Sequence, residues 1–268
     1  MTSPFDHLVL TRFNVRLKGM SSSVPAEVWL RGRIDLFDRY CVPSFAAQSR
    51  RGFRWIVLID AQSPAWLEPE IRSVAASHGV TVEVRSIDGE LSESLLGTAV
   101  ADLLSAPYVI TTRVDSDDVV ATDFVERIQD SFVEADRLLI DLVEGAQFHA
   151  GRLYLRRYRL NPFLSLIEKV PATGRVSTVL RDAHPQMSRH APVRSVRGGL
   201  PAWVQVVHGG NYANEVVGRR VSGEPFRSVF PTLPLGRAGV PEILWDRLRT
   251  RARVLAGLPS RALRRLVR

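Results

Sequence analysis

The sequence YVITTRVDSDD, residues 108–118, contains the two features on which the interpretation of this chain depends. Residues 108–114 are mostly β-branched or aromatic, which predicts a buried strand. Asp115, Asp117 and Asp118 follow within four residues. Three carboxylates at the end of a strand repel one another and resist burial, so a positive partner is required. A divalent cation with oxygen ligands is the usual partner, and such a cation would bring a phosphate with it.

Two other interpretations of this segment exist. Asp117 or Asp118 could cap the helix that follows, which is a common role for aspartate. If the carboxylates lay far from an open cleft and were neutralised by arginines, the metal interpretation would fail. Arg113 lies next to the carboxylates, and we expect it to offset their charge or to contact phosphate.

Strand and helix patterns alternate through the first half of the chain. The predicted strands are 8–15, 54–59, 80–84 and 108–114, and the predicted helices are 34–48, 68–77, 92–105 and 122–135. This order implies a mainly parallel sheet with helices on its crossovers. Ligands of such sheets bind outside the carboxyl ends of the strands. Because Asn14, Asp60 and Asp115 all follow predicted strands, we expect them at one edge of the sheet.

The second half of the chain is less regular. It contains predicted strands at 138–142, 147–157 and 203–207, a short helix at 162–170 and a loop at 171–201. A segment rich in proline and glycine, 225–241, is typical of a linker. We therefore expect one domain over residues 1–224, this linker, and a basic amphipathic helical tail over 242–268.

Length and composition fit a single α/β domain. With 268 residues, of which 45% are hydrophobic, the chain can bury a full core. It has no run of 18 apolar residues and no visible signal peptide. The single cysteine, Cys41, excludes an internal disulfide and fits a reducing compartment. The expected location is cytoplasmic.

The positive charge belongs to the tail. Residues 247–268 contain eight arginines and no acidic residue, which accounts for the whole net charge of +8. A body without excess charge argues against nucleic-acid binding. Trp245, Leu248, Ala252 and Leu255 would form one apolar stripe on a basic helix. This pattern suits peripheral contact with an anionic membrane, such as the inner face of the plasma membrane. The alternative is a disordered or docked arginine-rich end.

Five segments carry a resemblance to a known family. They are TRFN at 11–14, CVPSFAAQSRRGFRWIVLID at 41–60, TRVDSDD at 112–118, DAHPQM at 182–187 and WVQVVHGGN at 203–211. With these segments the chain resembles the rhamnosyl transferase family, whose members are GT-A-fold glycosyltransferases similar to family 2. The resemblance covers roughly residues 5–215, and the proline that opens the first motif in the family is absent here.

The resemblance implies a GT-A-like fold, that of the nucleotide-diphospho-sugar transferases, with a mainly parallel sheet flanked by helices and a C-terminal helical extension. It also implies that Thr11, Phe13 and Asn14 line the nucleotide site. Asp60 would form a hydrogen bond to the base of the nucleotide. Asp115 would face the ribose or the metal. Asp117 would bind the metal that bridges the donor diphosphate, and His208 would complete the coordination or touch the diphosphate. Aspartates and water suit Mg²⁺ or Mn²⁺, and a histidine ligand favours Mn²⁺.

The acceptor side is less well defined, because the family's usual base motif is not recognisable. Glu168 is the favoured catalytic base, and a surface ion pair is its alternative role. Asp182 and Glu215 are the other candidate bases. Three further residues are expected near the acceptor or sugar, although each could be purely structural: His184, Trp203 and Asn211.

The sequence thus predicts a metal-dependent glycosyltransferase. It would move a hexose, with rhamnose as one option, from a nucleoside-diphosphate sugar to a glycan or lipid-linked acceptor of the cell envelope, with inversion. One alternative is a nucleotidyltransferase that makes an activated sugar, but residues 11–18 lack the glycine-rich phosphate loop it would need. The other is a non-catalytic membrane-associated binding protein, which leaves the clustered carboxylates unexplained.

Overall fold

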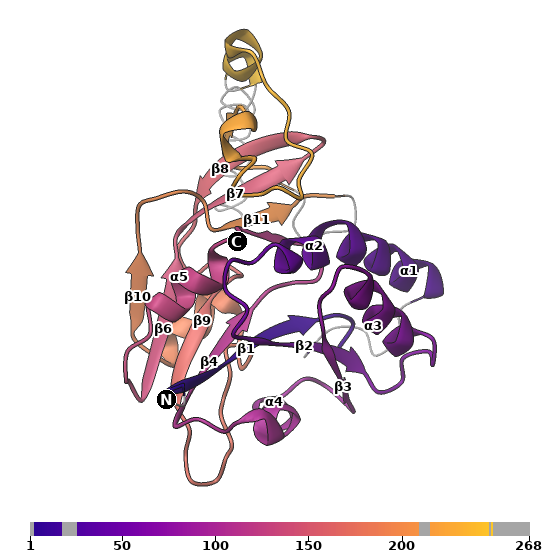
Figure 1. The fold of residues 1–268 in the computed structure, drawn as a ribbon, viewed down its shortest axis with the longest axis vertical. Helices are drawn as coiled ribbons and strands as arrows, with labels where there is room; N and C mark the ends of the chain where they lie inside the picture. The colour runs from indigo at the N-terminus through magenta and orange to yellow at the C-terminus, as the bar shows by residue number, and fades with distance from the viewer. Residues whose placement is uncertain (1–2, 18–25, 209–214, 247, 249–268) are drawn as a thin grey trace, which may run out of the picture.

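The computed structural model describes residues 3–17, 26–208, 215–246 and 248 (Figure 1). The strands are β1 (Phe5–Arg12), β2 (Arg54–Asp60), β3 (Glu83–Ile87), β4 (Tyr108–Arg113), β5 (Val119–Val120), β6 (Arg137–Leu142), β7 (Glu144–His149), β8 (Arg152–Arg157), β9 (Ser165–Lys169), β10 (Val193–Val196), β11 (Trp203–Val206) and β12 (Arg219–Val221). The α-helices are α1 (Glu27–Leu36), α2 (Val42–Ala46), α3 (Leu67–Ser77), α4 (Glu93–Val100) and α5 (Phe124–Asp130). A π-helical turn, η1 (Phe37–Cys41), joins α1 to α2, and short 3₁₀ turns are η2 (Ala101–Leu103), η3 (His184–Arg189) and η4 (Glu224–Phe226).

Seven strands form the central sheet, in the order β10-β6-β9-β4-β1-β2-β3. The pairs β4–β1, β1–β2, β2–β3 and β10–β6 are parallel, and only β9 runs antiparallel to its neighbours. The expected α/β class with a mainly parallel sheet is therefore confirmed.

Helices cover both faces of this sheet, which explains why its strands are apolar nearly throughout. Val9 and Trp55 point to one face and pack in a core shared with α1, α3 and α5. Leu8 and Leu58 point to the other face and pack against α4. Figure 1 shows α1 and α3 on one side of the sheet and α4 on the other.

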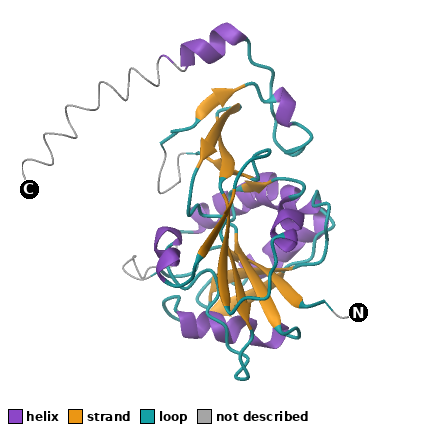
Figure 2. Ribbon diagram, turned by 90° about the vertical axis from the view of Figure 1, so that its left-hand side faces the viewer, coloured by secondary structure: helices purple, strands orange, loops and turns teal. Residues whose placement is uncertain are grey.

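A second, smaller sheet has the order β12-β8-β7-β11-β5. Its β7–β8 hairpin turns at Ala150 and Gly151, both with positive φ (48° and 74°), as a two-residue hairpin turn requires. The chain enters this sheet three times from the central one, from β4 into β5, from β6 into β7 and from β10 into β11. Figure 2 shows the two sheets one above the other.

Four predictions about the second half are wrong. The expected loop at 171–201 contains η3 and the strand β10, which pairs with β6. Residues 162–170 do not form a helix, because Ser165–Lys169 is the buried strand β9 between β4 and β6. A short apolar run fits either structure, and here the pairing decides. The expected single strand at 147–157 is the β7–β8 hairpin. The expected linker is part of the domain as far as Leu235, since Phe230 and Leu235 are buried in the main core.

The start of the C-terminal extension is helical, as expected, over residues 240–246. It contacts the second sheet through Asp246, which pairs with Arg220 of β12 and lies 3.4 Å from Arg152 of β8. The predicted amphipathic tail beyond residue 248 lies outside the described residues.

Candidate active site at the carboxylate turn

Residues 115–118, here called the carboxylate turn, connect the two sheets. The parallel strands β4, β1 and β2 end at the same edge, where the amide of Val114 donates to Leu10 (3.2 Å). The turn closes with a hydrogen bond from the amide of Asp118 to the carbonyl of Asp115 (3.2 Å) and leads directly into β5, which pairs with β11. Because α5 starts only at Phe124, neither Asp117 nor Asp118 caps a helix.

Two arginines hold the carboxylate of Asp115. Arg113 contacts both carboxylate oxygens, at 2.7 and 3.3 Å, and Arg12 lies 3.2 Å from one of them. Burial alone would raise the pKa of Asp115, but these two guanidinium groups hold the pKa well below its usual range. The Asp115 side chain is still 26% exposed, so a ligand can reach it.

Asp117 has two partners of its own. Its Oδ2 accepts a hydrogen bond from Arg33 of α1 (3.0 Å) and lies 2.9 Å from Nε2 of His208. Arg33 also donates to the hydroxyl of Ser116. The sequence analysis missed Arg33, which lies 84 residues before Asp117, in a helix predicted to start only at residue 34.

Asp118 connects the turn to the second sheet. Its Oδ1 accepts a hydrogen bond from the amide of Val206 in β11 (3.0 Å). Burial raises the pKa of Asp118, and the neighbouring charges of Asp117 and Asp115 add to this effect. The thiol of Cys41 in the π-helical turn contacts the carbonyl of Asp115 at 3.7 Å. Burial also raises the pKa of this thiol, so it is a packing group rather than a nucleophile.

The positive partners required by the three carboxylates are therefore present as Arg12, Arg33 and Arg113. The metal interpretation would fail if the carboxylates were both far from an open cleft and neutralised by arginines. The second of these two conditions, neutralisation by arginines, is met. Among the described residues, no group of three or more His, Cys, Asp and Glu side chains is arranged to hold a metal ion.

A cation with only two protein ligands would still fit here. Asp117 Oδ2 and His208 Nε2 are 2.9 Å apart, close to the roughly 3 Å expected for two adjacent ligands that each lie about 2.1 Å from one ion. Mg²⁺ often binds through one or two protein groups and takes its other ligands from substrate phosphates and water.

A second polar group lies at the carboxyl ends of β1 and β2. The side chain of Asn14 donates to Ser63 (2.9 Å) and accepts from the amide of Asp60 (3.2 Å). Asp60 is 2% exposed, and its carboxylate lies 2.7 Å from Arg16 and accepts from the amide of Gln62. Asn14 and Asp60 are thus brought together as expected, whereas Arg16 was not foreseen.

Thr11 and Phe13 do not project into this site. The hydroxyl of Thr11 accepts a hydrogen bond from the indole of Trp55 (2.9 Å) in the core. Phe13 is 3% exposed and packs edge-to-face against Phe37. Both positions belong to the β1 core, so their expected nucleotide contacts do not follow from this structure.

The expected acceptor residues have different environments. Nδ1 of His184 donates to the carbonyl of Leu160 (2.5 Å). Burial lowers the pKa of His184, and the nearby charges of Arg113 and Asp115 also act on it, so this ring lies close to the carboxylate turn. Trp203 is fully buried and stacks on Phe163 (4.9 Å), so it cannot line a sugar. Asn211 lies outside the described residues.

Neither Glu168 nor Asp182, two of the three candidate bases, contacts the carboxylate turn. Glu168 pairs in register with Val109, about 20 Å from Asp115 at about 3.3 Å per residue, at the other end of β4. Its carboxylate accepts from the amides of Ser177 and Thr178 and is 2% exposed, so it is a structural group. Asp182 is exposed and lies 3.0 Å from His190, which lowers the pKa of Asp182.

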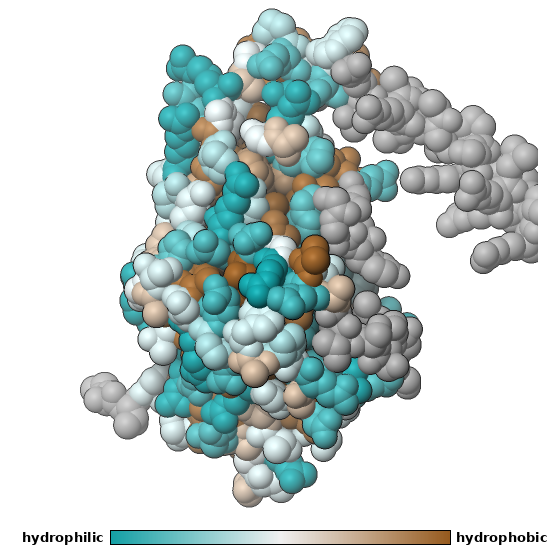
Figure 3. Space-filling model, turned by 90° about the vertical axis from the view of Figure 1, so that its right-hand side faces the viewer, coloured by the Kyte–Doolittle hydropathy of each residue, from teal (hydrophilic) through white to brown (hydrophobic). Residues whose placement is uncertain are grey.

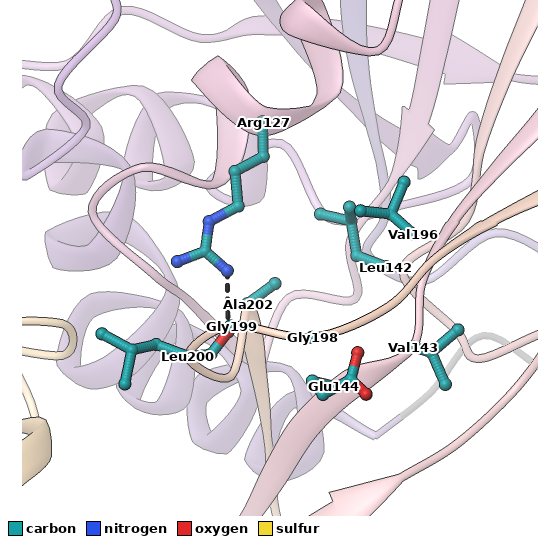
Figure 4. A pocket seen from close by; sticks show the side chains of 9 residues that line it. All are labelled: Arg127, Leu142, Val143, Glu144, Val196, Gly198, Gly199, Leu200 and Ala202. Atoms are coloured by element: carbon teal, nitrogen blue, oxygen red, sulfur yellow. Dashed lines mark hydrogen bonds between the residues drawn. The ribbon is translucent and has the colours of Figure 1, made fainter.

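A cavity of about 170 Å³ lies elsewhere, where the loop before β11 meets β6 and β7 (Figure 4). Its lining is mostly apolar, with Arg127 and Glu144 as its charged members. Arg127 is bound to the carbonyl of Leu200 (2.7 Å) and Glu144 to Arg157 (2.7 Å), so both charges are satisfied. None of the predicted site residues lines this cavity.

The fold is that of an α/β protein with a mainly parallel sheet and a charged turn at one edge of that sheet. The model of the family described as "Putative rhamnosyl transferase" matches residues 5–220, and the chain belongs to this family of glycosyltransferases. No curated protein matches the chain.

The solved structures to which this chain is similar share little sequence with it. They include TarS residues 1–349 from S. aureus in complex with UDP (14% identity, TM-score 0.41, 76% of this chain and 61% of that chain). Another is the mannosyltransferase PcManGT from Pyrobaculum calidifontis in complex with GDP-Man and Mn²⁺ (12%, 0.46, 77% and 58%). A third is a structure from Bacillus anthracis described as a "Putative Glucose-1-Phosphate Thymidylyltransferase" in complex with a sucrose (10%, 0.32, 74% and 88%). The chain therefore spans less than two thirds of the TarS and PcManGT chains.

Proposed function

We propose that this protein transfers a hexose, with rhamnose as the first candidate, from a nucleoside-diphosphate sugar to a glycan or lipid-linked acceptor, with inversion. Family membership supports glycosyl transfer. The observation that carries the proposal is the carboxylate turn, which is partly exposed, is paired with three arginines and lies at the same edge of the sheet as Asn14 and Asp60. Asn14 and Asp60 are proposed to contact the nucleoside, as the resemblance implies.

The charges of the turn suit a diphosphate that binds together with a cation. Arg12, Arg33 and Arg113 formally balance the three carboxylates, so an incoming diphosphate needs a further positive charge, which a divalent cation would supply. Guanidinium groups bind phosphate oxygens through paired hydrogen bonds, and these arginines can redirect their N–H groups from carboxylate to phosphate. Asp117 and His208 would hold a Mn²⁺ or Mg²⁺ ion, which when bound would neutralise the departing diphosphate.

Asp182 remains the proposed base for the acceptor hydroxyl. It lies two residues before His184, which is close to the turn, and the lowered pKa keeps its carboxylate ionised, as is usual for an aspartate at neutral pH. Loss of a general base costs about 10²- to 10⁴-fold, and a low pKa makes Asp182 a weak base, so we expect Asp182→Asn to lower kcat by about 10²-fold while donor binding is retained.

The proposed function is tested by nucleotide release from a panel of nucleoside-diphosphate sugars. We expect EDTA to suppress turnover and Asp117→Ala to reduce it by about 10²-fold or more, because one ligand of the cation is lost. Asp130→Ala, at an exposed residue paired with Arg50, is the matched control and should act as wild type. Unchanged turnover in both EDTA and Asp117→Ala would reject the metal–carboxylate mechanism.

We also propose peripheral contact with an anionic membrane, at the cytoplasmic face. Within the described residues, no helix combines the length and apolar character that a bilayer span requires. The helix at 240–246 and residue 248 expose apolar side chains: Val240, Leu244, Trp245 and Leu248 are 69, 51, 62 and 60% exposed. The face drawn in Figure 3 is otherwise mostly hydrophilic with small apolar patches. The eight arginines of 247–268 supply the matching charge.

A further inference from the structure

One face of the second sheet carries the polar side chains of Gln147, Arg156 and Gln205, here called the polar face, next to the buried Trp203. Gln147 of β7 pairs in register with Gln205 of β11, and Arg156 of β8 lies opposite Gly145 of β7. Because side chains alternate along strands, all these residues point to one face, whereas Phe148 and Val206 point to the hydrophobic core on the other.

Arg156 differs from the arginines of the carboxylate turn. It donates to Oε1 of Gln205 (2.7 Å), and its guanidinium lies 3.9 Å from the centre of the Tyr158 ring. In the part of the chain that the structure describes, no carboxylate lies within ion-pair distance of Arg156. Arg12, Arg33 and Arg113, by contrast, each pair with an aspartate. A half-buried guanidinium without an acidic partner is costly, and an anionic ligand would remove that cost.

Arg156 is linked to the carboxylate turn by a short series of contacts. The Tyr158 ring packs edge-on against His184 (5.9 Å between ring centres). His184 lies close enough to Arg113 and Asp115 for their charges to affect its pKa. On the other side, Gln205 precedes Val206, whose amide binds Asp118. The polar face is therefore contiguous with the proposed site of transfer, and it is separate from Asn14 and Asp60 on β1 and β2.

We propose that Arg156, Gln205 and Tyr158 bind an anionic group, a phosphate or a carboxylate, on the acceptor. This inference rests on the proposed glycosyl transfer and specifies its acceptor class. Arg156 would form a paired hydrogen bond to the anion, because its fork matches two oxygens of a phosphate or carboxylate. Tyr158 would offer the edge of its ring to the adjoining sugar, and Gln205 would hold the guanidinium in place. Arg12, Arg33 and Arg113 remain available for the donor diphosphate.

The test measures binding of a second anion to full-length protein that is first saturated with UDP or GDP, whichever raises Tm more. Inorganic phosphate, glucuronate and glucose are then titrated by calorimetry or by NMR. We expect phosphate or glucuronate to bind more tightly than glucose, and the stronger of the two identifies the source of the charge. Arg156→Gln should weaken anion binding at least about tenfold, the effect of losing one charge-assisted hydrogen bond, and Arg156→Lys should weaken it less.

Arg157→Gln is the matched control, because Arg157 is the next residue, is exposed and pairs with Glu144 at 2.7 Å. It should bind the anion as wild type does. Equal affinity in Arg156→Gln and wild type, or no anion binding by the nucleotide-saturated wild type, would overturn the proposal. Failure of the proposed function gives a different result, namely that neither UDP nor GDP binds. In that case an Arg156-dependent anion site could still be measured, but it would not belong to an acceptor.

Discussion

Each carboxylate of the turn has different partners and hence a different role. Asp115 is held by two arginines and stays ionised, while Asp118 is bound to the backbone of β11 and has a raised pKa. Asp117 alone combines an arginine with a histidine. At the scale of single residues, the proposed function therefore affects Asp117 most. On ligand binding, Asp117 would exchange its contact with Arg33 for a contact with the cation, and Arg33 would turn to the phosphate.

Arg33 provides a first test of this exchange. We expect Arg33→Gln to weaken binding of a nucleoside diphosphate by about 10- to 100-fold, the usual effect of losing a hydrogen bond to a charged group. Binding is measured by calorimetry in the presence of Mn²⁺. Arg31→Gln on the same helix is the control, because Arg31 is exposed and pairs only with Glu27 among the carboxylates of the described residues. Equal losses in both variants would argue against a specific role of Arg33.

His7 gives a prediction about stability and pH. Burial lowers the pKa of this ring from 6.5 to about 3, so it stays neutral in the fold, bound to Thr112 and Gln129. Between these two pH values only the unfolded chain binds the proton, so its contribution to the free energy of unfolding is complete above pH 6.5 and falls at lower pH, by at most about 1.4 kcal/mol per pH unit.

Urea unfolding at pH 7 and pH 5 measures this contribution. His7→Gln should show a smaller loss of stability between the two pH values than wild type, whatever its stability at pH 7. The same loss in both proteins would show that His7 titrates normally in the folded state.

At the scale of elements, the β7–β11 contact depends on a single missing side chain. The ring of Trp203 lies directly over Gly145, and a Cβ at that position would come within 2.2 Å of it. The indole also donates to the carbonyl of Leu142 (2.7 Å), which fixes the ring between the two sheets. Trp203 thus determines how closely the second sheet approaches the central one.

Gly145→Ala should therefore destabilise the protein by about 1–3 kcal/mol or more, because the Trp203 ring must move within a packed core. Gly32→Ala is the control: nothing lies within 4 Å of the added methyl group, and alanine favours helix α1 by up to about 1 kcal/mol. Thermal unfolding of both variants should show shifts of opposite sign. An unchanged Tm for Gly145→Ala would mean that the Trp203 ring is loosely held.

The predicted elements of the first half are confirmed, because long apolar runs and helical periodicity identify β2, β4, α3 and α4. The sequence could not separate helix from strand at β9, where five residues fit both patterns. In the site, the pairing of Arg113 with Asp115 follows from their spacing of two residues. Arg33 and Arg156 could not be predicted, since their contacts depend on tertiary packing across 49 to 84 residues.

At the scale of the whole molecule, the net charge is concentrated in the extension rather than in the body. The body is formally neutral, while the extension exposes apolar residues at its start and carries eight arginines beyond residue 246. Asp246 fixes the start of this extension to Arg220 and Arg152, so a membrane bound there would hold the second sheet near its surface. Lipid-linked acceptors would then be presented to the side of the molecule that carries this sheet.

Leu244→Glu combined with Leu248→Glu tests this orientation in the full chain. Each leucine contributes about 1.5–3 kcal/mol when fully buried in an apolar phase, so we expect more than tenfold weaker sedimentation with vesicles that contain anionic lipid. Val28→Glu, at an 84% exposed apolar position on α1, is the control. If the double variant bound these vesicles as well as wild type, the membrane role of this helix would be dismissed.

The carboxylate turn supplies four of the five residues, 114–118, that connect β4 to β5. An insertion or deletion there would change the register of one sheet against the other as well as the position of the charges. A change in the length of this connection would therefore disturb both the register of the two sheets and the position of the charges. Changes of substrate should instead accumulate in β8 and in the segment around His184, where replacing a side chain leaves the junction of the two sheets intact.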